Sequence, residues 1–362
     1  MATRSGILAA GVMLVDYVHR ISHWPEQGWL TEIQHSEKAA GGAPLNVLLT
    51  LSRMQCTLPL AAIGLLGNDA DGDFLLAMMK AAQIDYRLVQ RTDDKPTAMT
   101  QVMTAPDGQR TFFFSPGANS LLDRPHFAAV DDTQRIFHLG YLLLLETLDG
   151  VDSEFGTRSA RLLAHMQQRG YFTSLDLASR AGYFTSLDLA SRAGDYRPQV
   201  LPALRWLDYL VINELEAQAL SGVLLRDGRG IQPPAAFARA AQWLAEQGVR
   251  QRVVIHAPEG AWGREADGEG VWQPAWQLAP DAIVGSVGAG DAFCAGVLFA
   301  SHEGEDMVST LKLAHTCACF NLRAANATDG IRPLRDMREW MAQAVCVESP
   351  SPSGLTTSAE KT

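Results

Sequence analysis

The stretch Val284-Gly285-Ser286-Val287-Gly288-Ala289-Gly290-Asp291-Ala292-Phe293 leaves an apolar segment, turns through glycines and enters a predicted helix, Asp291 to His302. Glycines let the backbone approach a ligand closely, and the free N–H groups at a helix start attract anions. A carboxylate at this point can take the proton of a hydroxyl that attacks a phosphate. The Gly288-Ala289-Gly290 turn therefore predicts a phosphate site with Asp291 as general base, and a simple helix cap is the alternative for this aspartate.

Two other nucleotide-binding motifs do not fit this chain. A dinucleotide fingerprint, G-x-G-x-x-G, needs a third glycine where Phe293 stands. A Walker loop needs a lysine after a glycine, and no lysine of the chain follows one. The glycine turn therefore indicates a different kind of phosphate site.

Outward from this turn, apolar runs of strand length alternate with amphipathic segments of helix length, as in parallel strands joined by crossover helices. The clearest predicted strands are Gly6 to Ala10, Leu60 to Leu66, Ile136 to Leu139, Tyr209 to Ile212 and Val253 to His256. The other clear helices are Asn46 to Met54, Asp73 to Ala82, Glu154 to Arg169 and Pro234 to Gln247. The predicted fold class is α/β, with three layers and a doubly wound, mostly parallel sheet.

Two stretches interrupt this alternation. Residues 16–34 do not continue it, and residues 98–114 contain two Thr- and Phe-rich strands around a Pro-Asp-Gly turn. We expect both stretches to form a small separate β-sheet, and residues 1–15, 35–97 and 115–347 to form the large α/β domain. The tail, residues 348–362, is rich in Ser, Thr and Pro and is expected to be disordered.

Composition limits the partners and the compartment. The formal charge is −10, and Lys and Arg form no run, so we expect a small-molecule substrate and no nucleic acid. The five cysteines are sparse and odd in number, which favours reduced thiols in the cytoplasm. No apolar run reaches the ~18 residues of a membrane span. Residues 1–10 lack the pattern of a signal peptide.

Twelve residues occur twice in tandem. Tyr171 to Gly182 reads YFTSLDLASRAG, and Tyr183 to Gly194 repeats it without change. Two copies are too few for a solenoid, so a duplication is the simpler account. Only one copy can fill one strand position. We expect Phe184 to Leu189 to be the strand, because the extra copy then lies away from the carboxyl ends of the strands, where ligands bind.

Two further motifs stand beside predicted elements. Gly41-Gly42-Ala43-Pro44-Leu45-Asn46 precedes an apolar helix, and the Asn46 amide offers a donor and an acceptor that suit a polyhydroxyl substrate. Asn213 and Glu216 follow the strand that ends at Ile212, where an amide and a carboxylate can hold Mg²⁺ through water. Helix capping is the alternative for both motifs.

In this order and spacing the segments resemble the ribokinase-like, or phosphofructokinase-B type, family of sugar kinases. The resemblance runs from about Gly6 to about Pro333. It is carried by Gly11 to Asp16, Gly41 to Asn46, Ile63 to Asp69 with Asp71-Gly72 after it, Asn213 to Glu216, and Gly288 to Phe293. The resemblance implies a β-sheet lid, ATP as the donor, Mg²⁺, an acceptor with a hydroxymethyl group, and a homodimer through the lid.

The resemblance also implies a role for each motif. It places Asp291 as the base and Gly288 to Gly290 as the anion hole. Asn213 and Glu216 would organise the metal and the phosphates, with Glu216 reaching the metal through water. The implied acceptor contacts are Asp16, Gly41, Gly42 and Asn46.

Two segments depart from the family pattern. Gly285 and Ser286 stand where the family commonly has Asp-Thr, so the chain lacks the Asp from which relatives build a monovalent-cation site. The nucleotide motif Thr-x-Gly-x-x-Gly here reads Ile255-His256-Ala257-Pro258-Glu259-Gly260, which keeps only its last glycine. His256 and Gly260 are the candidates for nucleotide contact, and a purely structural histidine is the alternative for His256.

The sequence therefore predicts an ATP-dependent kinase that phosphorylates the hydroxymethyl group of a sugar or related small alcohol. A nucleoside kinase is one alternative, and a catalytically weak binding or regulatory protein on the same scaffold is another. Asp291 favours an enzyme, because a regulatory relative is expected to lose its base.

Overall fold

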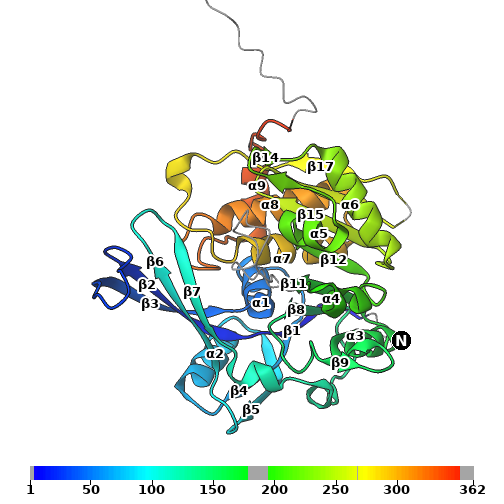
Figure 1. Cartoon of the computed structure of the whole chain (residues 1–362). Coiled ribbons are helices and arrows are strands. Elements are labelled where there is room, and N and C mark those ends of the chain that lie inside the picture. Colours follow the sequence, from blue (N-terminus) through cyan, green and yellow to red (C-terminus); the bar gives the residue numbers. More distant parts are fainter. Residues whose placement is uncertain (1–3, 178–194, 267, 351–362) are drawn as a thin grey trace, which may run out of the picture.

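The computed structural model describes residues 4–177, 195–266 and 268–350. Within them the chain forms a nine-stranded sheet in the order β17-β16-β15-β12-β11-β8-β1-β4-β5 (Figure 1). Strands β5 to β15 of this order are parallel, and β16 and β17 are antiparallel. The strands are β1 (Ile7–Gly11), β4 (Leu60–Gly67), β5 (Asp85–Thr92), β8 (Ile136–Leu142), β11 (Phe172–Leu177), β12 (Tyr209–Asn213), β15 (Arg252–Ala257), β16 (Gly260–Glu265) and β17 (Val271–Pro274).

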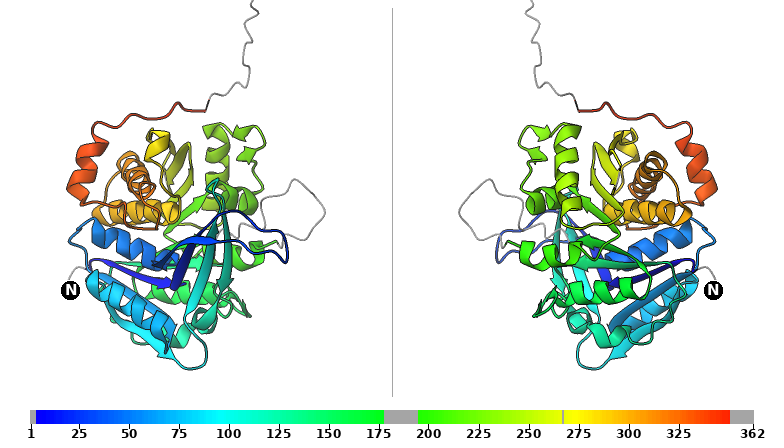
Figure 2. Two further views of the ribbon diagram at one scale, coloured as in Figure 1. Left: turned by 90° about the vertical axis from the view of Figure 1, so that its left-hand side faces the viewer. Right: turned by 90° about the vertical axis from the view of Figure 1, so that its right-hand side faces the viewer.

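Helices cover both faces of this sheet, which gives the three layers seen edge-on in Figure 2. One face packs against α3 (Arg158–Gln168), α4 (Arg197–Leu204), α5 (Glu214–Ser221) and α6 (Pro234–Glu246). The other packs against α1 (Ala43–Arg53), α2 (Ala70–Ala81), α7 (Ala289–Glu303), α8 (Met307–Asn321) and α9 (Leu334–Met341). Short 3-10 turns lie at Gly117–Leu121, Arg124–Phe127 and Pro280–Ala282. The predicted α/β class is confirmed.

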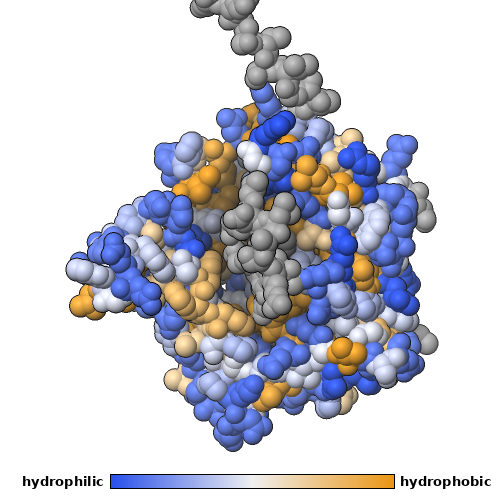
Figure 3. Space-filling view, in the orientation of Figure 1, coloured by the Kyte–Doolittle hydropathy of each residue, from blue (hydrophilic) through white to orange (hydrophobic). Residues whose placement is uncertain are grey.

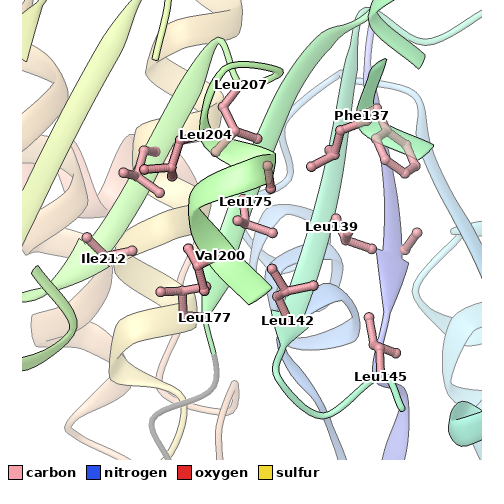
Figure 4. Close-up of a cluster of buried hydrophobic side chains, with 14 of the residues drawn as sticks. Phe137, Leu139, Leu142, Leu145, Leu175, Leu177, Val200, Leu204, Leu207 and Ile212 are labelled. Carbon is pink, nitrogen blue, oxygen red and sulfur yellow. The ribbon is translucent and has the colours of Figure 1, made fainter. Parts of the chain in front are cut away.

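The core divides between the two faces because side chains alternate along each strand. Leu8 and Ala10 of β1 point to the α3–α6 side, whereas Ile7 and Ala9 point to the α7–α8 side. On the first side, leucines of β8 and β11 meet Val200 and Leu204 of α4 (Figure 4). This continuous apolar packing on both faces fixes the strand ends, and with them the side chains that follow the strands.

The two interrupting stretches form a second, four-stranded sheet in the order β3-β2-β6-β7. It stands off the main body on the left of Figure 1. Its strands are β2 (Leu14–Ile21), β3 (Ile33–Gly41), β6 (Ala98–Thr104) and β7 (Arg110–Ser115). The sheet thus takes in residues beyond the predicted stretch 16–34, because β2 begins at Leu14 and β3 continues to Gly41. Two-stranded pairs also join β9 (Val151–Asp152) to β10 (Gly156–Thr157), and β13 (Arg226–Asp227) to β14 (Gly230–Ile231).

The predicted start of α3 at Glu154 is wrong, because residues 151–157 form the β9–β10 turn. Asp152 Oδ1 accepts the N–H groups of Glu154 and Phe155, which closes that turn. Thr157 then caps α3 by accepting the N–H of Ala160. The other predicted helices agree with the structure to within a few residues.

The choice of repeat copy is also wrong, because the first copy supplies β11. Tyr171 follows α3 after a tight turn in which its N–H donates to Met166 O, and its ring packs edge-on against Phe137 at 6.4 Å. Helix-to-strand connections in α/β folds are usually this short, and a longer one costs closure entropy. The second copy, Phe184 to Leu189 included, lies outside the described residues, as does the tail from residue 351.

Within the part of the chain that the structure describes, no helix is both long enough and apolar enough to span a membrane.

Candidate active site

The glycine turn forms the first turn of α7 and leaves donors free. Gly288 caps the helix in the left-handed conformation, with φ of 73°, which favours glycine. No side chain caps this end, and the N–H groups of Gly290 and Asp291 have no acceptor among the described residues. The α7 start therefore presents two backbone donors and the positive end of a helix dipole to an anion.

Asp291 is a buried carboxylate beside these donors. Asn46 Nδ2 donates to its Oδ2 at 2.7 Å, and Tyr141 Oη donates to the same oxygen at 3.4 Å. Burial raises the pKa of Asp291 to about 6, and the two hydrogen bonds limit the rise because they favour the charged form. The group is therefore mostly ionised at neutral pH and can accept a proton.

Asn46 reaches Asp291 because α1 begins tightly against β1. Gly42 has φ of 91°, and a Cβ there would lie 2.0 Å from Val12 O, so only glycine fits. Pro44 occupies the first turn of the helix. The Asn46 side chain is buried, and its Oδ1 has no partner among the described residues. This oxygen is a buried acceptor without a donor, a situation that a hydroxyl ligand would relieve.

Asp16 approaches Asn46 and Asp291 from the small sheet. It stands in β2 opposite Thr100 of β6, and a Cβ at Gly41 would lie 2.2 Å from its Oδ2. Gly41 therefore leaves the room that this carboxyl occupies. Burial raises the pKa of Asp16 to about 7, the Thr100 hydrogen bond opposes the rise, and the charge of Asp291 adds to it. The structure thus brings Asp16, Asn46 and Asp291 to one place.

Asn213 and Glu216 form a capping box at the start of α5. Asn213 Oδ1 accepts the N–H of Glu216 at 2.9 Å, and Glu216 Oε2 accepts the N–H of Asn213 at 3.0 Å. The capping role is therefore present in full. Glu216 is nevertheless buried close enough to the site for its charge to raise the pKa of Tyr141 and of Asp176.

Sequence reasoning missed Tyr141 and Asp176. Tyr141 follows the predicted strand Ile136 to Leu139 and adopts φ of 60°, an uncommon value for a non-glycine residue. Asp176 lies at the end of β11, in the repeat copy that we did not expect in the sheet. Their position at the carboxyl ends of two neighbouring parallel strands is the signal that could have identified both.

The carboxylates suit a hydrated divalent cation. Burial raises the pKa of Asp176, and repulsion from Asp291 and Glu216 raises it further. A cation among these groups would relieve that repulsion. No cluster of three or more His, Cys, Asp or Glu side chains in the described residues could hold a metal by itself. The arrangement therefore fits Mg²⁺, which keeps several waters and needs only one or two protein carboxylates.

The two candidates for nucleotide contact lie at different places. His256 is the last residue but one of β15 and packs on Phe293 of α7, with the ring centroids 4.7 Å apart. Burial lowers the pKa of His256 to about 4, so the ring is neutral and supports the glycine turn from beside it. Gly260 begins β16, where a Cβ would lie 2.4 Å from the Trp272 ring. The structure thus brings His256, but not Gly260, into contact with α7.

Solved structures with the same architecture define the class of fold. One is a nucleoside kinase of Methanocaldococcus jannaschii, described as an archaeal member of the ribokinase family; it has a TM-score of 0.71 and 16% identity, with 94% of this chain and 100% of that chain covered. Another is the ribokinase of Arabidopsis thaliana complexed with ribose and ATP, with a TM-score of 0.71 and 19% identity over 94% and 99% of the two chains. The fold is ribokinase-like, as predicted.

Sequence comparison adds curated relatives. The probable fructokinase-3 of Arabidopsis thaliana is 31% identical over 153 residues, which is 40% of this chain and 42% of that protein. The chain thus spans less than half the length of this relative. The ribokinase of Schizosaccharomyces pombe is 23% identical over 342 residues, 91% of this chain and 96% of that one. Residues 7–333 match the pfkB family carbohydrate kinases, and the chain belongs to this family.

Proposed function

We propose that this protein is an ATP-dependent kinase that phosphorylates a hydroxymethyl group of a sugar or related small alcohol, with Asp291 as the general base. The observation that carries the proposal is the buried Asp291 carboxylate at two free helix N–H groups, beside the unpaired Asn46 Oδ1. The names of the relatives, fructokinases and a ribokinase, support a sugar as the acceptor.

The site residues would divide the reaction between them. Asn46 Oδ1 and the Asp16 carboxylate accept hydrogen bonds from acceptor hydroxyls, and Gly41 and Gly42 keep the backbone close to that ligand. Asp291 takes the proton of the attacking hydroxyl as its oxygen bonds to the γ-phosphorus, and the bond to the ADP oxygen breaks. The Gly290 and Asp291 N–H groups hold the charge on the transferred phosphoryl oxygens.

The opposite side of the site would hold the donor. Glu216, with Asp176 beside it, would hold Mg²⁺ through water, and Asn213 fixes Glu216 in the capping box. Mg²⁺ would neutralise phosphate charge there. His256 and Gly260 would lie on the nucleotide side of the glycine turn.

The small sheet would act as a lid over the acceptor and as a dimer contact. Its outer end exposes apolar side chains, including Leu30 at 94% and Trp29 at 74%. Figure 3 shows hydrophobic surface at this tip, at the far left of the view. Such a surface is typical of an interface. We also propose a cytoplasmic location, because all five cysteines are free.

An ADP-release assay tests the function, with fructose, ribose, other sugars and nucleosides as acceptors. We expect turnover with a sugar, and a fall in kcat of about 10²- to 10⁴-fold in Asp291→Asn. If only nucleosides are phosphorylated, the acceptor is a nucleoside and not a sugar. If Asp291→Asn keeps its activity, Asp291 is not the general base. If the protein binds ligands but turns none of them over, it is a binding protein and not a kinase.

A further inference from the structure

The chain after α9 turns back along the outside of the molecule, as the red segment of Figure 2 shows. Its residues 345–347, which we call the C-terminal clasp, pair with residues 275–277, just after β17. Two backbone hydrogen bonds join the segments, from Gln277 N–H to Val345 O at 2.7 Å and from Val347 N–H to Ala275 O at 2.9 Å. They frame an isolated antiparallel bridge. The clasp thus holds three residues that lie beyond the nine-stranded sheet.

A buried tryptophan anchors the same three residues from the other side. Trp276 is buried, and its indole N–H donates to Thr316 Oγ1 of α8 at 3.0 Å. Its ring packs edge-on against Trp340 of α9, with the ring centroids 6.4 Å apart. Because a buried indole N–H usually finds a hydrogen-bond partner, this contact attaches the segment firmly to the helical layer. Residues 275–277 are therefore held by the clasp through their backbone and by two helices through a side chain.

The held segment also contacts the candidate nucleotide segment, residues 255–260. Ala275 N–H donates to Glu259 O at 3.0 Å, while the carbonyl oxygen of the same alanine accepts the bond from the clasp. The neighbouring Gly260 pairs with Pro274 at the end of β17. A single residue, Ala275, therefore links the clasp to the turn between β15 and β16 through backbone hydrogen bonds.

Residues 278–287 connect the held segment to the glycine turn of α7. Within the described part of the chain, residues 278–283 form hydrogen bonds only with each other, in their 3-10 turn. Val284 and Gly285 then donate their N–H groups to Leu322 O at 2.8 and 3.2 Å. The connecting segment is thus held at its two ends, by the clasp before it and by Leu322 after it.

We propose that the C-terminal clasp is a positioning element for the adenine nucleotide, because it holds residues 278–287 in the conformation that contacts the bound nucleotide. This role rests on the proposed kinase function, which places the ATP phosphates at the glycine turn. A segment that is held at both ends has fewer conformations to lose when it closes on a ligand, so the clasp strengthens nucleotide binding. The proposed acceptor contacts lie in β2, β3 and α1, to which the clasp forms no hydrogen bond within the described residues.

Single substitutions in the full chain test the clasp. Val347→Pro removes the N–H that binds Ala275 O, and the extended bridge before it suits the residue that precedes a proline. Val347→Ala shortens the same side chain but keeps the N–H. Ser349→Pro adds a proline where the backbone N–H has no partner among the described residues. Trp276→Phe removes only the indole donor, and it serves as the second test should Val347→Pro fail to fold.

Two measurements follow each variant. Calorimetric titration gives the affinity for the non-hydrolysable analogue AMP-PNP with Mg²⁺, and hydrogen exchange compares residues 278–287 with β4. We expect Val347→Pro and Trp276→Phe to weaken AMP-PNP binding by about 5- to 10-fold, as the loss of one hydrogen bond implies. Exchange should become faster in residues 278–287 and stay unchanged in β4. Val347→Ala and Ser349→Pro should bind AMP-PNP within about twofold of wild type.

A Val347→Pro protein that binds AMP-PNP like Ser349→Pro overturns the inference, because the clasp then has a structural role alone. Exchange that rises equally in β4 also overturns it, since the whole fold is then loosened. The ADP-release assay separates this test from the proposed function. If sugars are phosphorylated and the clasp variants bind AMP-PNP normally, only the function stands. If AMP-PNP binding depends on the clasp but no acceptor is phosphorylated, only the inference stands. Wild type that does not bind AMP-PNP refutes both.

Discussion

At the scale of single residues, Asp291 experiences two opposing demands. Its burial disfavours the charged carboxylate, whereas the proposed proton abstraction requires that charge. Asn46 and Tyr141 each donate a hydrogen bond to Oδ2, and these bonds stabilise the charged form of the buried carboxylate. The pKa of about 6 is thus low enough for a base at neutral pH and close enough to it for effective proton transfer.

The pH dependence of activity follows from this pKa. A base acts only when deprotonated, so kcat/KM should fall tenfold per pH unit below about 6. In Tyr141→Phe one of the hydrogen bonds that lower the pKa of Asp291 is lost, so the acidic limb should move to higher pH. Initial rates between pH 4.5 and 9 check both statements. A Tyr141→Phe limb that coincides with that of wild type would contradict the role of the tyrosine.

The same carboxylate should destabilise the fold above about pH 6. Its folded pKa of about 6 exceeds the ordinary value of 3.8, so its contribution to stability is full below 3.8 and is lost as pH rises through about 6. Asp291→Asn removes the buried charge and should therefore raise the free energy of unfolding by about 1–3 kcal/mol at pH 8. Urea unfolding without ligand at pH 8 and pH 4 measures this. A gain at pH 4 as large as that at pH 8 would be inconsistent with a charge effect.

The predictable site residues were those in local motifs. Asp291, Asn46 and Gly41-Gly42 stand at helix starts with characteristic glycines, so the pattern alone marked them. Tyr141 and Asp176 have no such local pattern, since their importance comes from strand ends that meet only in the folded sheet.

At the scale of elements, a three-residue ion-pair network joins the candidate nucleotide segment, residues 255–260, to α5. Arg226 of β13 donates through Nε to Glu214 Oε1 at 2.7 Å and through Nη2 to Glu259 Oε2 at 2.6 Å. Glu214 is the first residue of α5, and Glu259 lies in the turn between β15 and β16. The network therefore holds in place a turn that keeps only the last glycine of the family motif.

We expect Arg226→Ala to weaken nucleotide binding and to leave acceptor binding unchanged. It leaves the buried Glu214 without its counter-charge, so stability should fall by about 1–3 kcal/mol. The KM for ATP should rise about 5- to 10-fold, a change of about 1 kcal/mol, while the KM for the acceptor stays constant. Steady-state kinetics with each substrate varied checks the split. Arg229→Ala, in the adjacent exposed turn, is the matched control, and equal increases in both KM values would exclude a nucleotide-specific role.

Element types were predictable where periodicity was strong, as in β1, β4, α6 and α7. The start of α3 was not, because Asp152 and Thr157 form a turn and a cap that resemble ordinary helix-start residues in the sequence. The choice between identical repeat copies could not come from composition at all. It depends on the short connection that joins Met166 and Tyr171.

At the scale of the whole molecule, the small sheet exposes the apolar tip described above. If this tip is a dimer contact, Leu30→Glu should convert a dimer into a monomer, because burial of an unpaired charge is unfavourable. Light scattering coupled to size-exclusion chromatography measures the mass. Val151→Glu is the control, since Val151 is 88% exposed on the main body. A wild-type monomer at all concentrations would refute the contact.

The overall architecture was predictable because alternating apolar and amphipathic segments leave few ways to bury both faces of a sheet. The order of strands and the approach of the small sheet to the α7 start depend on contacts between residues far apart in sequence, such as Asn326 with Glu37. No local pattern encodes such contacts.

The first copy of the tandem repeat supplies every side chain of β11. Because the copies are identical, an in-frame deletion of either one at the level of the gene produces the same polypeptide. That product keeps the complete strand and Asp176, and only the connection to α4 is shortened. A single in-frame deletion in the gene can therefore remove the insertion without changing any residue of the core.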